Sequence, residues 1–307
     1  MQELRTDLLT GETVILATGR ALRPDTFRVQ AAPLPAAVAS CPFCPGNEHE
    51  TPPEVMRMGP GAAETPGWRV RVVPNKYPLV GDGVAGAHEV VILSPAHDQS
   101  VGELAAPAMG DAFVALRDRT AFHLGNGLVY AQPFVNHGKA AGASIEHPHA
   151  QLVALDFVPD RVAARAKRFA AAGDLVRTDM DASPLVADGD VAVWCPYGSA
   201  TPYVARVAAR DAGPRFDEAT DEEVRAVADA LQDTVARMQK LLGGLAYNVV
   251  IETAPRDLNT EFHWWVDVIP RLTVAAGFEL GTGTWANIVA PDAAAAALRE
   301  VDLQDAE

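Results

Sequence analysis

Apolar and polar residues alternate regularly along most of the chain after about residue 65, and this pattern predicts a series of strands and helices. A capping box at Ser100-Val101-Gly102-Glu103 predicts the start of a helix that continues to about Leu124. A second, basic and Ala-rich helix is expected at 159–171. The strands expected around these helices lie at 68–73, 88–93, 127–135 and 151–157.

The second half of the chain repeats this order of elements. A second capping box, Thr220-Asp221-Glu222-Glu223, begins 120 residues after the first and predicts a helix to about Leu242. The strands expected around it lie at 190–194, 203–208, 246–252 and 262–269. Short turns join most of the strands, and each half has one long central helix. This arrangement predicts a duplicated unit of the α+β class, with packed helices and a mostly antiparallel sheet.

The first 65 residues are rich in Pro, Gly and Ala and contain one expected strand, at 12–17. We expect the rest of this segment to form ordered loops. The predicted organisation is an N-terminal half, 1–160, and a C-terminal half, 161–307. The residues with reactive side chains gather in the N-terminal half.

The charge balance is strongly acidic, with 25 Lys and Arg residues against 40 Asp and Glu residues and a net charge of -15. A nucleic-acid partner is therefore not expected, because such proteins usually present a basic surface. No apolar run approaches the roughly 20 residues of a membrane helix, so no membrane partner is expected. The N-terminus lacks the layout of a signal peptide, which predicts a cytoplasmic location.

Three cysteines occur in the chain, too few for a disulfide framework, and two of them form the pair Cys41-Pro42-Phe43-Cys44. This spacing allows both thiolates to bind one metal ion, and a structural zinc would need two more ligands. Unbound thiols and a redox pair are the alternatives. A redox pair usually lies at the start of a helix, whereas this pair lies in a loop rich in Pro and Gly.

The segment His147-Pro148-His149-Ala150-Gln151 places two histidines two positions apart, so on an extended strand both side chains point the same way. They are interpreted as exposed loop residues, as a metal pair, or as one ligand and one nucleophile. A neutral imidazole attacks phosphorus well at neutral pH. The preceding segment, 136–144, is rich in small residues that allow backbone N–H groups to approach a phosphate closely.

Taken in order, these motifs resemble the galactose-1-phosphate uridylyltransferase family, within the histidine-triad superfamily. The resemblance covers nearly the whole chain and predicts two histidine-triad-like halves. It rests on Leu9-Thr10-Gly11-Glu12, Arg20, Arg23-Pro24, Cys41-Pro42-Phe43-Cys44-Pro45-Gly46, Asn75, Ser94-Pro95-Ala96-His97, Asn136 to Ser144 and His147-Pro148-His149-Ala150-Gln151.

The resemblance implies a role for each matching residue. His149 would accept the nucleotidyl group, and Gln151 would hydrogen-bond the phosphoryl oxygens. A Zn²⁺ ion would be bound by Cys41, Cys44, His97 and His147. The substrate contacts would come from Arg20, Arg23, Asn75, Asn136 and Ser144. Lys139 is either a further phosphate contact or a solvated lysine of the same loop.

The expected activity is uridylyl transfer between UDP-glucose and a hexose 1-phosphate through a nucleotidyl-histidine, with a nucleotide sugar and a sugar 1-phosphate as substrates. Family members are commonly dimers, so a homodimer is expected. The stretches Pro270-Arg271-Leu272 and 277–283 resemble the ADP-glucose phosphorylase branch. Adenylyl transfer, from ADP-glucose or a dinucleoside polyphosphate, is therefore the alternative. A nucleotide-binding protein without catalysis, held by zinc, is the second alternative.

The segment 262–267 contains one histidine, so a second metal site found in some family members is not expected here. Gln151 stands where the hydrolase branch of the superfamily has a third histidine. A glutamine cannot act as an acid for water attack. We therefore expect the intermediate to react with a phosphate acceptor.

Overall fold

A sheet of ten strands forms the centre of the protein, in a computed structural model that describes residues 2–19, 40–258 and 261–303. All its strand pairs are antiparallel. In sheet order the strands are β3 (Met56–Met58), β4 (Val70–Pro74), β5 (Gly86–Ile92), β7 (His149–Leu155), β6 (Tyr130–His137), β11 (Tyr247–Glu252), β12 (Trp265–Pro270), β10 (Ala205–Ala209), β9 (Val191–Trp194) and β8 (Leu185–Asp188).

The strand order is the same in the two halves of the chain. From the edge to the centre, the first half runs β3-β4-β5-β7-β6 and the second runs β8-β9-β10-β12-β11. The long helix follows the third strand in each half: α1 (Ala106–Gly125) follows β5, and α4 (Asp221–Leu242) follows β10. The expected α+β fold with a duplicated unit is confirmed. The predicted boundary at residue 160 lies at the start of α2 (Asp160–Ala172) and stays a prediction, since one sheet runs through both halves.

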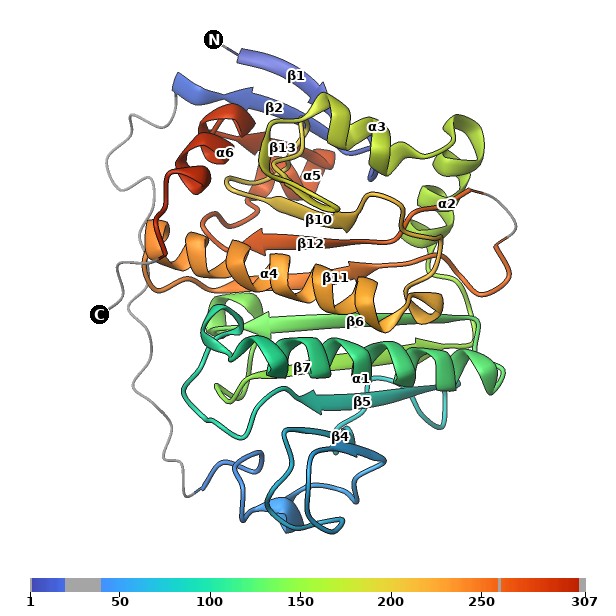
Figure 1. Ribbon diagram of the computed structural model, residues 1–307. Helices are drawn as coiled ribbons and strands as arrows, with labels where there is room; N and C mark the ends of the chain where they lie inside the picture. The colour runs from blue at the N-terminus through green and yellow to red at the C-terminus, as the bar shows by residue number, and fades with distance from the viewer. Residues whose placement is uncertain (1, 20–39, 259–260, 304–307) are drawn as a thin grey trace.

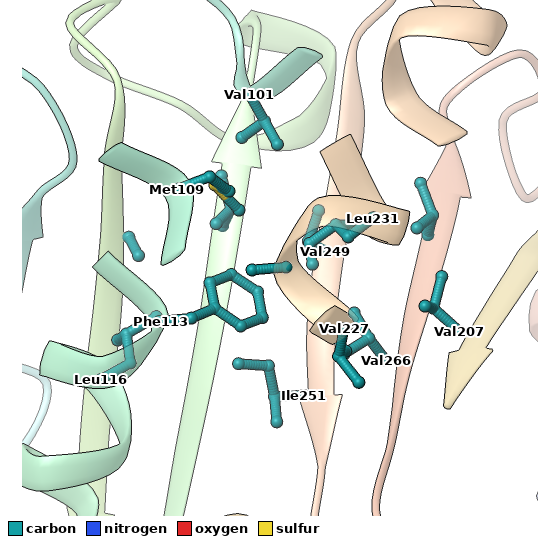
Figure 2. Packing of buried hydrophobic residues seen from close by; sticks show 14 of the residues in the cluster. Val101, Met109, Phe113, Leu116, Val207, Val227, Leu231, Val249, Ile251 and Val266 are labelled. Carbon is teal, nitrogen blue, oxygen red and sulfur yellow. The ribbon is translucent and has the colours of Figure 1, made fainter. Parts of the chain in front are cut away.

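Helices α1 and α4 lie side by side across one face of the sheet (Figure 1). Their apolar sides pack with the strands into the main core, in which Phe113 and Met109 of α1 face Val249 and Ile251 of β11 (Figure 2). Strand side chains alternate between the two faces of a sheet, so residues two positions apart on β7 lie on the same face and neighbouring residues lie on opposite faces. Ala150, Leu152 and Ala154 belong to this core. His149, Gln151 and Val153 therefore point to the opposite face of the sheet.

That opposite face has different covers in the two halves. In the first half it carries a small apolar cluster that includes Cys41, Phe43, Cys44 and Ile92. In the second half, α2 and α3 (Leu175–Ala182) cover it through a cluster that includes Trp265. In the first half this face of the sheet therefore lies close to the loops that carry the motifs. In the second half helices cover it.

A smaller sheet joins distant parts of the chain, because β2 (Thr13–Ala17) lies between β1 (Gln2–Thr6) and β13 (Thr284–Asn287). The remaining helices of the described chain are α5 (Gly277–Thr282), α6 (Pro291–Arg299) and the short 3-10 turns η3 (Glu48–Glu50), η4 (Val101–Glu103), η5 (Lys139–Ala141) and η6 (Phe216–Glu218). Among the described helices, none combines the length and apolar character that a membrane-spanning helix requires.

The expected strands and the long helices match the structure to within a few residues, but two expectations were wrong. Residues 2–6 and 56–58, expected as loops, pair with neighbouring strands as β1 and β3. The first capping box does not begin the long helix. Glu103 does accept a hydrogen bond from the Ser100 N–H at 2.7 Å, but the box begins only a single 3-10 turn, η4. Helix α1 begins at Ala106 with Pro107 in its first turn, where a missing N–H is tolerated. The second box starts α4 as predicted, with Thr220 Oγ1 accepting from the Glu223 N–H at 3.2 Å.

Candidate active site and metal centre

His149 is the first residue of β7, and its ring is buried with 6% of its surface exposed. Its Nδ1–H donates a hydrogen bond to the carbonyl oxygen of His147, at 2.8 Å. The proton is therefore on Nδ1, and Nε2 keeps its lone pair. Burial lowers the pKa of His149, which favours the neutral ring. The chain thus holds an imidazole in the form that can attack an electrophile.

Four buried side chains, Cys41, Cys44, His97 and His147, meet beside this strand end, and their ligand atoms all lie within 4.8 Å of one another. Cys44 Sγ is 3.3 Å from His97 Nδ1 and 3.6 Å from His147 Nδ1. A tetrahedron with zinc bonds of about 2.0–2.3 Å has edges of about 3.3–3.8 Å, so these spacings are close to those of a zinc site. The structure brings together all four residues that the sequence assigned to the metal.

The chemistry of these donors also fits a divalent cation. His147 Nε2–H donates to the Ser94 carbonyl oxygen at 2.7 Å, which leaves Nδ1 as the free electron pair facing Cys44. Burial raises the pKa of Cys44 to about 11, so a thiolate here needs a compensating positive charge. The four residues can therefore hold zinc with two sulfur and two nitrogen ligands. Such an ion would join the cysteine loop to the start of β7.

Gln151 lies two residues beyond His149 on the same face of β7. Its Oε1 is 2.9 Å from His88 Nε2, and the Leu79 N–H donates to the other ring nitrogen of His88 at 3.1 Å. Asn75 Nδ2 lies 3.1 Å from His88 Nε2, and its Oδ1 accepts from the Tyr77 N–H at 2.8 Å. Two residues predicted to contact substrate, Gln151 and Asn75, therefore converge on His88, a residue that the sequence did not assign to the site.

The loop 136–144 rests on the second half of the chain. Gly138 has a φ of +80°, and a Cβ on it would lie 2.9 Å from the Ala246 Cβ, so any other residue there would be strained and would force the loop to shift. The ring of His137 stacks on Tyr247 with centroids 4.7 Å apart. Asn136 Oδ1 accepts a hydrogen bond from Asn248 Nδ2 at 2.7 Å. The second half thus supports the loop that precedes β7.

The other predicted contacts are distributed around this site. Lys139 and Ser144 are exposed on the loop. Arg20 and Arg23 lie outside the described residues. A pocket is lined by residues 135–138 and 145–149 together with Leu93 and Val101, so the loop and His149 share one cavity wall.

The comparisons with known proteins agree over the length of the chain. A family model described as a domain of unknown function (DUF4921) matches residues 108–303. The ADP-glucose phosphorylase of Arabidopsis thaliana is 30% identical, over 98% of this chain and 93% of that protein. The galactose-1-phosphate uridylyltransferase of Thermotoga maritima is 25% identical, over 99% of this chain and 100% of that protein.

Similarity to solved structures gives the same result. The crystal structure of the Arabidopsis thaliana ADP-glucose phosphorylase with bound ADP-glucose has a TM-score of 0.87 and 28% sequence identity to this chain. The superposition covers 99% of this chain and 100% of that one.

Proposed function

The chain belongs to the galactose-1-phosphate uridylyltransferase-like (DUF4921) family of nucleotidyltransferases, as its sequence motifs indicated, and from this premise we propose that it transfers an adenylyl group from an ADP-sugar to inorganic phosphate through His149. The observation that supports this proposal most directly is the hydrogen bond from His149 Nδ1 to the His147 carbonyl. It fixes the tautomer whose Nε2 can form a bond to phosphorus.

The reaction has two similar steps. In the first, the Nε2 lone pair attacks the α-phosphorus, the bond from this phosphorus to the bridging oxygen breaks, and the sugar 1-phosphate leaves. In the second, an oxygen of inorganic phosphate attacks the same phosphorus, the phosphorus–nitrogen bond breaks, and ADP leaves. The imidazole is positively charged while it carries the nucleotide. The His147 carbonyl dipole stabilises that charge, because it accepts the Nδ1–H throughout.

Phosphoryl transfer depends mainly on position and charge stabilisation. The NH₂ groups of Gln151 and Asn136, together with the small-residue loop, are the proposed donors to the phosphoryl oxygens. Lys139 would add positive charge at the loop. Zinc on Cys41, Cys44, His97 and His147 would stabilise the loop geometry.

The preference for adenine rests on the relatives. The similarity is higher to the ADP-glucose phosphorylase, at 30% identity, than to the uridylyltransferase of Thermotoga maritima, at 25%. This reverses the order of the two nucleotides expected from the sequence motifs. Uridylyl transfer between UDP-glucose and a hexose 1-phosphate remains the second candidate, because that relative is similar over its whole length. Dimerisation is proposed on the same family basis, and light scattering that gives a monomer mass would contradict it.

The test is the intact mass of the protein after incubation with ADP-glucose or UDP-glucose at neutral to basic pH, where phosphohistidine is stable. We expect an adduct of AMP mass on the wild type and on His49→Ala, whose exposed imidazole serves as the control, and none on His149→Ala. Added phosphate should then remove the adduct and release ADP. An adduct of UMP mass alone would support the second candidate. The absence of both adducts would refute transfer through His149 from these sugars.

A further inference from the structure

Two carboxamide side chains flank His149 on the same face of the sheet. Gln151 is two residues further along β7. Asn136 lies on the neighbouring strand β6, next to Val135, which pairs with Ala150. A phosphoryl group on His149 would meet either the NH₂ group or the oxygen of each amide. The orientation of each amide matters, because an NH₂ group attracts phosphate oxygens and a carbonyl oxygen repels them.

The orientation of the Gln151 amide follows from the backbone of Leu79. Its N–H donates to His88 Nδ1, so the proton of a neutral His88 ring is on Nε2. Burial lowers the pKa of His88, which favours this neutral form. Asn75 offers no acceptor here, because the atom that it turns toward His88 Nε2 is Nδ2, while its oxygen faces the Tyr77 N–H. His88 Nε2–H therefore donates to Gln151 Oε1, and the Gln151 NH₂ group points away from His88.

The orientation of the Asn136 amide follows from Arg271 and Ala141. Arg271 Nε–H donates to Asn248 Oδ1 at 2.5 Å, and Asn248 Nδ2 donates to the Ala141 carbonyl at 2.9 Å. Both contacts require the NH₂ group of Asn248 to face the loop, where it also donates to Asn136 Oδ1. The Asn136 NH₂ group is therefore turned toward Gly142, where a Cβ would lie 3.8 Å from it.

We propose that His88 and Asn248 are positioning residues that hold the amides of Gln151 and Asn136 with both NH₂ groups toward the phosphoryl group on His149. Neither NH₂ group donates to another residue in the described part of the chain. The inference deepens the proposed function and rests on it. It assigns to the second half a positioning role, since Asn248 and Arg271 determine how Asn136 presents its donors.

Asn248→Asp is the sharpest test, because it replaces the NH₂ group by an oxygen of similar size. Aspartate still accepts from Arg271, but it cannot donate to Asn136 Oδ1, so the Asn136 amide turns and presents its oxygen to the phosphoryl group. Loss of one donor to an anionic centre slows such reactions by about 10²–10³-fold. We expect adduct formation from ADP-glucose to be at least about 10²-fold slower at saturation, with a small change in the ADP-glucose concentration for half-maximal rate.

The matched control is Asn287→Asp. Asn287 is also buried, and its Nδ2 donates to the Ser199 carbonyl at 2.9 Å in the separate small sheet. We expect both variants to lose similar thermal stability, and only Asn248→Asp to lose rate. Equal rates for the two variants would overturn the assignment of Asn248.

A double-mutant cycle tests His88. We expect His88→Phe to slow adduct formation by about 10-fold or more in the wild type and to have no further effect in Gln151→Leu, since His88 acts through Gln151. Slowing by the same factor in both backgrounds would indicate a general structural effect and overturn the assignment.

Failure of the proposed function gives a different result, namely no adduct on the wild type. In that case neutron diffraction from the unliganded protein still decides the orientation, because it locates amide deuterium atoms directly. The inference requires the deuterated nitrogens of Gln151 and Asn136 to face the His149 side, and either amide found reversed would overturn it.

Discussion

The ring Nε2 of His147 lies 2.7 Å from the Ser94 carbonyl oxygen, and the ring Nε2 of His263 lies 2.9 Å from the Ala209 carbonyl oxygen. Each histidine precedes by two positions the last strand that its half contributes to the ten-stranded sheet, β7 in the first half and β12 in the second. The repeated fold therefore keeps the orientation of this histidine in both halves.

The atoms that face Nδ1 differ between the two histidines. His147 Nδ1 faces Cys44 Sγ, whereas His263 Nδ1 lies 3.2 Å from an oxygen of Asp174, the residue that caps α3. The first arrangement belongs to a cluster of four possible metal ligands, and the second is a polar contact with a helix end. The two histidines occupy equivalent positions of the repeat, but their Nδ1 atoms face different residues, Cys44 and Asp174, so their chemical environments differ.

Cys44→Ser should abolish zinc binding, because it removes one of two sulfur ligands from the buried cluster. We expect about one zinc per chain in the wild type and in Cys195→Ser, and little in Cys44→Ser, by mass spectrometry of the native protein. Cys195 is a suitable control because it is buried in the main core. Full zinc content in Cys44→Ser would contradict the assignment. A zinc-free wild type would contradict it as well.

Asp267 should make stability depend on pH. Burial, aided by the carboxylates of Glu252 and Asp7 and opposed by Arg206, raises the pKa of Asp267 to about 6. A raised pKa in the folded state means that stability is greatest when Asp267 is protonated and is lost as the pH rises through about 6. Asp267→Asn removes this titration. We therefore expect the free energy of unfolding of the variant, relative to the wild type, to rise by about 1 kcal/mol from pH 5 to pH 8.

Urea denaturation at the two pH values measures this change. The exposed residue Asp211, replaced by Asn, is the control and should follow the wild type at both pH values. A constant difference between Asp267→Asn and the wild type would show that Asp267 has the same pKa in the folded and unfolded states.

The regular alternation of the sequence was sufficient to predict the strands around both long helices, whereas the face of the sheet on which His149 lies was seen only in the structure. The four metal-site residues could be assigned only with the family resemblance, because Cys41 and His97 are brought together by the fold. The pairing of β2 with β13 was not predicted for the same reason. The two strands are more than 260 residues apart in the sequence, and the residues of neither strand indicate which strand it pairs with.

His88 and Asn248 were missed because their importance lies in contacts. His88 occupies one alternating position of an ordinary strand, and only the register of β5 with β7 brings it to Gln151. Asn248 reaches Asn136 through the pairing of β6 with β11, which joins the two halves. Register between distant strands is set by tertiary packing, so residue types and local spacing do not reveal it.

Phe113→Ala should destabilise the protein strongly. The ring is fully buried between α1 and the sheet (Figure 2). It also makes an edge contact with Phe216 at a centroid distance of 6.4 Å. Such truncations lose about 3–5 kcal/mol, since a cavity remains. Phe122→Ala, on the same helix but half exposed, should lose less than about 1 kcal/mol. Urea denaturation would contradict this prediction if the two variants were equally stable.

Gly138→Ala should separate strain in the loop from contact with the second half. Gly138 and Gly127 both have positive φ, at +80° and +103°, so alanine is strained at either position. A Cβ at Gly127 meets nothing within 4 Å, whereas a Cβ at Gly138 lies 2.9 Å from the Ala246 Cβ. We expect both variants to lose about 1 kcal/mol of stability or somewhat more.

Only Gly138→Ala should also slow adduct formation on His149, by about 10-fold or more, because the loop must move away from β11 and take Asn136 out of its contact with Asn248. Single-turnover rates from intact mass measure this effect, with Gly127→Ala as the reference. If the two variants reacted equally fast, the contact with Ala246 would not be what positions the loop, and the second half would act on His149 through the β6–β11 pairing alone.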